Sequence, residues 1–249
     1  MAVDKNPTVE LIKNAISFCL LILSIVIING LIFNRQTGLS EDSHPAAAFV
    51  LLWFAVLWLS VVEGGQASLV GLAPVNRELY RDTHPLAYKC CKLAHEGDSL
   101  DRYLLGRQFM VVFIVFSINI SGGPIEDAEL WGLPDTFLSI FLGSGLVMIL
   151  FTTMVGQLNS QVNASHCMLD YLNNWVNYTT LVVAMVIEFS GLVHAAYVIQ
   201  MFVAAAAGQE IQSKEAPRSP LQNLFFFFPL HHVDRRFGLC LHGDFGGSL

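Results

Sequence analysis

Charged residues and paired cysteines are both scarce in this sequence. Only 13% of its 249 residues are charged and 54% are hydrophobic, whereas about a quarter of the residues in an ordinary soluble domain are charged. The five cysteines are scattered, and none has the spacing of a metal site or a disulfide framework. These absences exclude a soluble domain, a zinc module and a disulfide scaffold, and we expect no nucleic-acid partner.

Catalytic signatures are also missing. The chain has no Gly-x-Ser-x-Gly elbow, no His-Glu-x-x-His pair and no phosphate-binding loop in a plausible setting. We therefore expect no enzyme activity, no catalytic residue and no bound cofactor. The adjacent Cys90 and Cys91 follow several basic residues; idle loop thiols are favoured for them over palmitoylation sites.

Long apolar runs are what the sequence has in abundance. A membrane-spanning helix needs roughly 20 mostly apolar residues, and five stretches come near that length, at 15–33, 46–62, 103–120, 136–156 and 179–207. The sequence thus predicts an all-α integral membrane protein with about five transmembrane helices in a domain over residues 15–207. A cytoplasmic leader, 1–14, precedes this domain, and a polar, Phe-rich tail, 208–249, follows it.

Basic residues between the runs predict the orientation. Residues 73–102 carry five Lys or Arg, the last of them Arg102, whereas residues 121–135 carry none and hold four acidic residues, among them Glu126, Asp127 and Glu129. Since Lys and Arg favour the cytoplasmic side, we expect residues 73–101 to form a solvated cytoplasmic loop, the acidic segment to lie outside and the N-terminus inside.

Two polar motifs flank this basic loop. Glu63-Gly64-Gly65-Gln66 closes the second apolar run, and an ionisable side chain in hydrocarbon usually lines a solute path. The glycines are expected to loosen the helix there, as in the interrupted helices of transporter sites. A helix end with a glycine cap is the alternative.

Gly106-Arg107-Gln108 opens the third run. Arg107 can simply extend to the headgroups, but both motifs lie at similar depth, so we predict that Glu63 pairs with Arg107 and that Gln66 faces Gln108. Amides both donate and accept hydrogen bonds, which suits a neutral polyhydroxy solute.

Amide side chains also recur after the fourth run. Gln157 and Gln161, like Asn159 and Asn163, are four residues apart and form polar stripes on a helix. The absence of Lys and Arg there leaves a cavity lining and an interfacial helix as equal alternatives.

The fifth run contains Glu188 and His194. A carboxylate at membrane depth is a proton, cation or partner site by default, so Glu188 is an ion-coupling candidate; Gly191, Tyr197 and Gln200 share its predicted face. A lone histidine is more often satisfied by nearby backbone, which is the favoured interpretation of His194.

Several separated motifs occur together in a specific order. They are Glu63 to Val75, Leu93 to Asp98, Gly106 to Phe109, Gly156 to Leu158, Gln161 to Asp170 and Glu188 to Leu192. In this order they resemble the silicon (silicic acid) transporters of diatoms, and the resemblance extends to about Asn223.

The resemblance implies sodium-coupled uptake of silicic acid, most simply across the plasma membrane. It makes solute-recognition candidates of the residues that match the family's motifs: Glu63, Gly64, Gln66, Gly106, Arg107 and Gln108, with Gly156 and Gln157 as an extension. No sodium ligand is singled out beyond the candidate Glu188.

Length is the departure from the resemblance. The resemblance implies ten helices in two inverted five-helix repeats, whereas this chain has one such repeat. A half-size form acting as a homodimer would need opposite insertions, which the asymmetric loops oppose, so we favour an incomplete form lacking its C-terminal half. A non-transporting five-helix regulatory subunit is the alternative function, and an intramembrane enzyme using Glu188 and His194 is a minor one.

Overall fold

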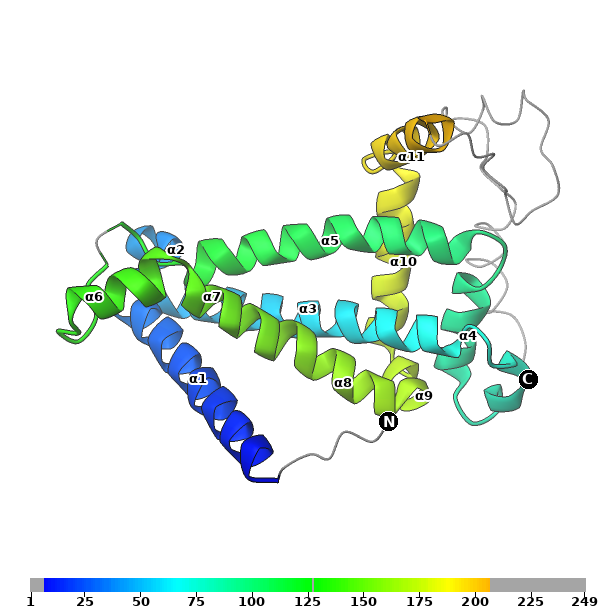
Figure 1. The fold of residues 1–249 in the computed structure, drawn as a ribbon. Coiled ribbons are helices and arrows are strands. Elements are labelled where there is room, and N and C mark those ends of the chain that lie inside the picture. Colours follow the sequence, from blue (N-terminus) through cyan, green and yellow to red (C-terminus); the bar gives the residue numbers. More distant parts are fainter. Residues whose placement is uncertain (1–6, 127, 207–249) are drawn as a thin grey trace, which may run out of the picture.

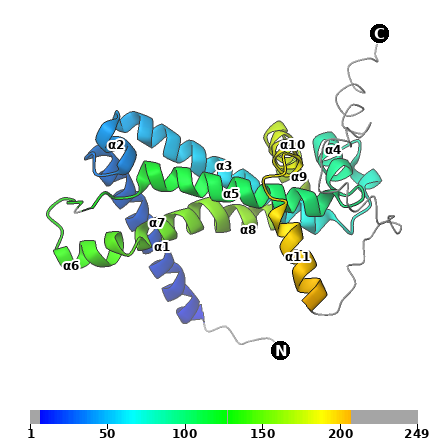
Figure 2. The same ribbon diagram turned by 90° about the horizontal axis from the view of Figure 1, so that it is seen from above.

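The computed structural model describes residues 7–126 and 128–206, and within them the chain is built from helices. Figures 1 and 2 show α3, α5 and the series α7, η3 and α8 running side by side, with α1 leaning away from them and α10 crossing them. The elements are α1 (Pro7–Phe33), α2 (Gly38–Asp42), α3 (Pro45–Leu72), the 3-10 helix η1 (Arg77–Tyr80), α4 (Pro85–Ala94), α5 (Ser99–Gly122), α6 (Asp135–Leu138), the π-helix η2 (Ser139–Gly143), α7 (Leu146–Phe151), the π-helix η3 (Thr152–Leu158), α8 (Asn159–His166), α9 (Met168–Leu172), α10 (Trp175–Phe189) and α11 (Ala195–Ala206).

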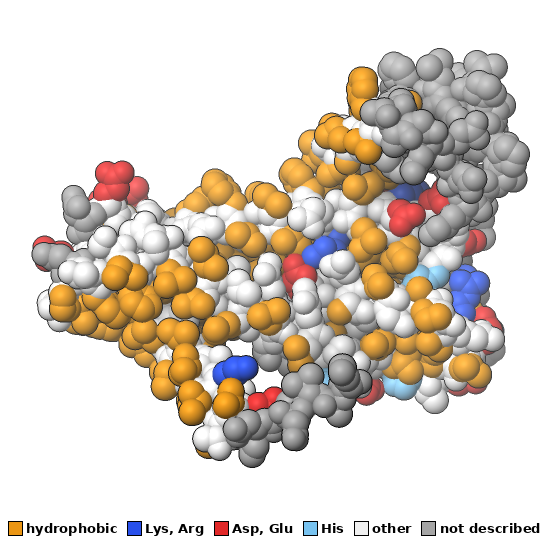
Figure 3. Space-filling view, viewed as in Figure 1, with side chains coloured by type: hydrophobic (Ala, Val, Ile, Leu, Met, Phe, Trp, Pro, Cys, Tyr) orange, Lys and Arg blue, Asp and Glu red, His pale blue; other side chains and the backbone are white. Residues whose placement is uncertain are grey.

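The core lies where α3 packs between its neighbours. Leu52 and Leu59 of α3, Ile118 of α5 and Phe151 of α7 are fully buried. Apolar side chains also cover much of the outer face (Figure 3), where a small group of acidic and basic atoms lies near the middle. A largely apolar outer face is the pattern of a protein that lipid surrounds.

Helix α1 joins the core only through its second half. Ile28 and Leu31 are fully buried, whereas Ile16 and Phe18 are exposed. The helix begins at Pro7, so residues 7–14 of the predicted leader are helical. The extra helical turns have few tertiary contacts because α1 leans away from α3 and α5 (Figure 1).

Three helices in the described part of the chain are long and apolar enough to cross a membrane: residues Thr8–Phe33, Pro45–Leu72 and Ser99–Gly122. A fourth span arises if Thr136–Gly143 and Leu146–His166, which are bent by 49° at their junction, count as one. The first three predicted runs each lie within one of these long helices. By length and hydropathy, the described residues therefore contain three or four candidate spans and not the five of the predicted repeat.

The fourth run departs from a simple span. The helix breaks where Gly145 takes a left-handed φ of 71°, a conformation that glycine adopts without steric cost. After the break the helical path continues to His166, well beyond the predicted end at residue 156. The predicted boundaries 136–156 therefore miss both the bend and the extension.

The fifth run, predicted over 179–207, is two helices. Helix α10 ends at Phe189 and α11 begins at Ala195, with Gly191 at a φ of 86° in the turn between them. The 15 residues of α10 correspond to about 22 Å of helix, which is shorter than a bilayer core of about 30 Å. Hydropathy alone did not reveal this break because apolar residues continue on both sides of it.

Residues 73–101 are more ordered than a solvated loop. Helix α4 packs against α9 and α10 and buries Ala87, Cys90, Cys91 and Ala94. Its mixture of small apolar and basic residues gives it one buried and one polar face. Both thiols are buried, which argues against both the loop-thiol and the palmitoylation interpretations. The predicted tail, 208–249, lies outside the described residues.

Candidate functional site

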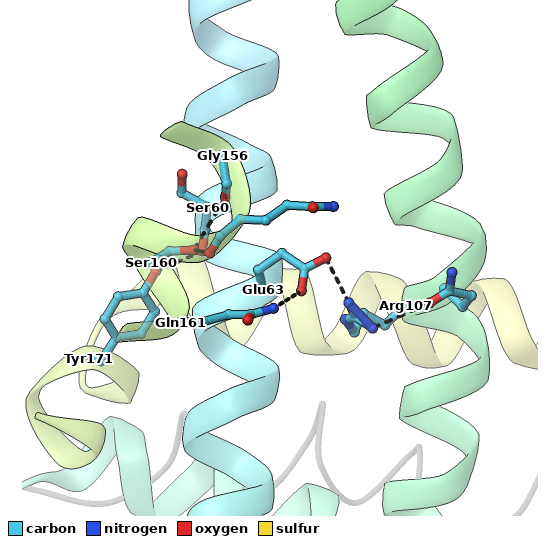
Figure 4. Close-up of polar contacts among 9 residues, drawn as sticks. Ser60, Glu63, Arg107, Gly156, Ser160, Gln161 and Tyr171 are labelled. Carbon is cyan, nitrogen blue, oxygen red and sulfur yellow. Dashed lines mark hydrogen bonds and ion pairs between the residues drawn. The ribbon is translucent and has the colours of Figure 1, made fainter. Parts of the chain in front are cut away.

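A buried carboxylate on α3 is the centre of the candidate site. Glu63 Oε1 lies 2.9 Å from Arg107 Nη2 of α5, and Gln161 Nε2 of α8 donates to Glu63 Oε2 at 2.9 Å. Figure 4 shows the three side chains converging from their three helices. Both oxygens of the carboxylate are therefore engaged, each by a different helix.

The charges of Glu63 and Arg107 need these partners because both side chains are buried. The side chains of Glu63 and Arg107 are 5% and 7% exposed, and an isolated charge so far from water is very costly. Pairing makes the site neutral as a whole. The ion pair predicted from the two flanking motifs is confirmed.

Arg107 keeps unused hydrogen-bonding capacity. Its Nη1 lies 3.5 Å from Gln108 Oε1, at the limit of a hydrogen bond, and its buried Nε has no hydrogen-bond partner among the described residues. Gln66 is half-buried and Gln108 is exposed. In the described chain, no hydrogen bond joins these two amides, so their predicted approach stays a prediction.

The motif glycines bring the helices close together. A Cβ on Gly64 would overlap the Tyr171 ring, and one on Gly106 would overlap the backbone carbonyl of Ala184 in α10. A Cβ on Gly156 would lie 2.8 Å from Leu59 Cδ2 of α3. Small residues of this kind allow close helix packing in membranes.

This packing corrects one expectation for the first motif. Helix α3 runs unbroken from Pro45 to Leu72, so Gly64 and Gly65 do not loosen it, and Glu63 does not mark a helix end. A Cβ on Gly65 would lie 2.7 Å from Asn177 Oδ1. The glycines therefore serve as contact surfaces for Tyr171 and Asn177, and the helix keeps its own hydrogen bonds.

A second set of hydrogen bonds ties η3 and α9 to α3 beside the carboxylate. The Tyr171 hydroxyl donates to the Ser60 carbonyl at 2.8 Å, and Ser60 Oγ donates to the Val155 carbonyl of η3 at 3.3 Å. Ser160 Oγ donates to the carbonyl of Gln157 at 2.8 Å. The extension residues Gly156 and Gln157 thus belong to a backbone framework next to Glu63 (Figure 4).

The buried Glu188 forms a second ion pair, with a partner that is partly exposed. Arg102 Nε of α5 lies 2.8 Å from Glu188 Oε2, and the Tyr197 hydroxyl of α11 donates to Oε1 at 3.3 Å. Arg102 precedes Arg107 by five residues, or about 7.5 Å along a helix. The two ion pairs therefore lie on neighbouring turns of α5. The His194 ring lies against Tyr197, with centroids 5.5 Å apart.

An open hollow of about 390 Å³ lies elsewhere, at the junction of α8 and α9. Its lining includes His84, Cys167 and Asp170, and His84 Nε2 lies 3.1 Å from Asp170 Oδ1. No group of metal-ligating side chains occurs within residues 7–126 and 128–206. We place the candidate site at Glu63, where the buried charges are.

A family model described as "Silicon transporter" matches residues 5–233. The chain belongs to the silicon transporter family. This confirms the resemblance drawn from the ordered motifs, and the match covers both ion pairs. Searches of curated proteins and of solved structures found no match. A silicon transporter family member with several apolar helices is a membrane protein with a transport role, which agrees with the lack of enzyme motifs.

Sequence reasoning missed three contacts of this silicon transporter family member. Arg102 was counted only as an orientation signal, although it pairs with Glu188. Tyr171 was not considered, and Gln161 was assigned to an amide stripe without a partner. The stripe itself was the available signal, because a helix face of uncharged amides indicated a polar surface opposite it.

Proposed function

We propose that the chain binds silicic acid at the ion pair of Glu63 and Arg107 and takes part in its uptake across the plasma membrane. The observation that supports this most is the buried, neutral pair with its unpartnered Arg107 Nε. Buried donors without partners are rare in proteins, so this one is a candidate contact for a solute.

The charges of the site favour an uncharged solute. Glu63 would repel an anion and Arg107 would repel a cation, whereas a hydroxyl can donate to the carboxylate and accept from the guanidinium. Silicic acid is largely uncharged at neutral pH and has four hydroxyls. The amides of Gln66 and Gln108, which complete the motifs, would add further donors and acceptors.

Sodium coupling is proposed from the family resemblance. Oxygen ligands suit a hard cation, and Glu188 remains our candidate, with its charge matched by Arg102. A sodium ion bound there would have to exchange with the guanidinium. We propose that the transporting unit also includes a second copy of the chain or a C-terminal half.

Proteoliposomes test this proposal. Uptake of radioactive germanic acid, an analogue of silicic acid, is measured with and without a sodium gradient, and equilibrium binding is measured on the same protein in detergent. We expect binding by the parent chain and its loss in Glu63→Gln, Gln66→Ala and Gln108→Ala.

The two readouts separate the parts of the proposal. Binding without uptake supports a solute site in an incomplete transporting unit, and sodium-dependent uptake supports a self-sufficient one. A folded chain that binds no germanic or silicic acid refutes the proposed function and favours the regulatory subunit.

A further inference from the structure

The hydrogen bond from Gln161 occupies the oxygen of Glu63 that the ion pair leaves free. Glu63 Oε1 is held by Arg107 and Oε2 by Gln161 Nε2, at 2.9 Å in each case. The ion pair alone neutralises the charge, so the Gln161 contact adds a neutral hydrogen bond to the free carboxylate oxygen. A hydroxyl group of a solute would make the same kind of contact.

The position of Gln161 is imposed by packing around it. Helix α8 follows Gly156, which lies against Leu59 of α3, and its other end leads to Tyr171, whose hydroxyl is bonded to Ser60. Gln161 itself is only half-buried. Its backbone is therefore held against α3, while its side chain retains room to change rotamer.

A second observation points to a ligand at the same place. Arg107 is 6% exposed, yet its Nε has no hydrogen-bond partner in the described residues. One group with a donor and an acceptor, placed beside the carboxylate, would satisfy this nitrogen and replace Gln161 on Glu63. A neutral hydroxyl has both.

We propose that Gln161 is a solute-binding residue whose amide occupies, in this structure, the place of a solute hydroxyl on Glu63. This inference rests on the proposed function. On binding, the solute hydroxyl donates to Glu63 Oε2, a solute oxygen accepts from Arg107 Nε, and the released Gln161 amide bonds to the solute. The exchange keeps the carboxylate satisfied in both states, so the site never exposes an unpaired oxygen to lipid.

Two substitutions test the role of Gln161. Gln161→Leu keeps the approximate size and removes the amide, and Gln161→Glu keeps the shape but carries a donor only when protonated. Near a second carboxylate a carboxyl group holds its proton more tightly. At pH 8 we expect both variants to bind germanic acid about tenfold more weakly, because each loses the hydrogen bond from the released Gln161 amide to the solute; tenfold is the upper end for one neutral hydrogen bond.

Acidic pH separates a binding role from a packing role. At pH 5.5 we expect Gln161→Glu to recover to within about threefold of the parent chain, since its protonated carboxyl can donate to Glu63 in the empty site and to the solute in the bound one. Gln161→Leu should not recover. Asn163→Asp is the matched control, because Asn163 is an exposed residue of the same helix whose amide bonds only to Asn159 among the described side chains.

Equilibrium binding of germanic acid to the full chain in detergent is the measurement, with monodisperse gel filtration as the check of folding. If Gln161→Glu does not fold, a pH-independent loss of binding in folded Gln161→Leu supports the proposal. Variants that bind within twofold of the parent chain overturn it, as does a loss in Gln161→Glu that persists at pH 5.5. A parent chain without binding overturns the proposed function as well, so the two failures are distinct.

Discussion

Breaking the ion pair between Glu63 and Arg107 should destabilise the fold strongly. With both side chains at least 93% buried, solvent screens the pair little, and removing one partner of a buried pair costs about 3–5 kcal/mol. For a chain of this size, 1 kcal/mol shifts the melting temperature by about 2–4 °C. We therefore expect Glu63→Gln and Arg107→Met each to lower it by about 6–20 °C.

The double variant is the critical comparison. With both charges removed, no unpaired charge stays buried, so Glu63→Gln combined with Arg107→Met should melt well above either single variant. The buried thiols Cys90 and Cys91 provide the assay, because a fluorogenic maleimide reports their exposure on unfolding once the other cysteines are serine. Single variants within about 2 °C of the parent, or a double variant at least as unstable as the sum of the singles, would refute the reasoning.

Three further predictions concern packing and titration. Gly106→Ala should destabilise the chain by about 3 kcal/mol or more in thermal melts, because the new methyl overlaps a backbone carbonyl of α10; Gly143→Ala, with open space around it, should not. Burial raises the pKa of the Cys90 thiol to about 12, so maleimide at pH 8 should label it on the order of a thousandfold more slowly than a thiol of usual pKa, about 8.5, with exposed Cys167 as the internal reference on peptide mapping. Because the folded pKa is raised, the stability due to this protonated thiol is present below pH of about 8.5 and is lost as the pH rises toward 12; fast labelling in the folded state would contradict this. Tyr171→Phe should lower the free energy of unfolding by about 1 kcal/mol, since it removes one neutral hydrogen bond to α3, and an unchanged melt would show that the bond contributes nothing.

The ion pair of the site could be predicted from the sequence because its two residues flank one connecting segment. Glu63 lies nine residues before the end of α3 and Arg107 lies eight residues after the start of α5, so two spans joined on that side hold these residues at similar depth. The third partner could not be found in this way. Gln161 lies 98 residues after Glu63, and its approach depends on the bend before α7 and on the contact of Gly156 with α3.

Helix boundaries were least predictable where glycine breaks an apolar run. Gly145 and Gly191 adopt positive φ, whereas Gly64 and Gly65 lie in continuous helix. Gly145 and Gly191 lie inside predicted apolar runs and Gly64 and Gly65 lie just after one, so the runs did not show which glycines break a helix. The difference lies in tertiary contacts. Tyr171 and Asn177 pack against Gly64 and Gly65, whereas a Cβ on Gly145 or Gly191 would meet open space.

Glu63 and Arg107 together carry no net charge, and this determines how the site would respond to voltage. A single elementary charge moved through the membrane potential exchanges about 2.3 kcal/mol per 100 mV. A rearrangement that carries both residues together moves no net charge, and a neutral solute adds none. Binding and reorientation at this site would then be electrically silent, so any current that accompanies uptake would be carried by the coupled ion.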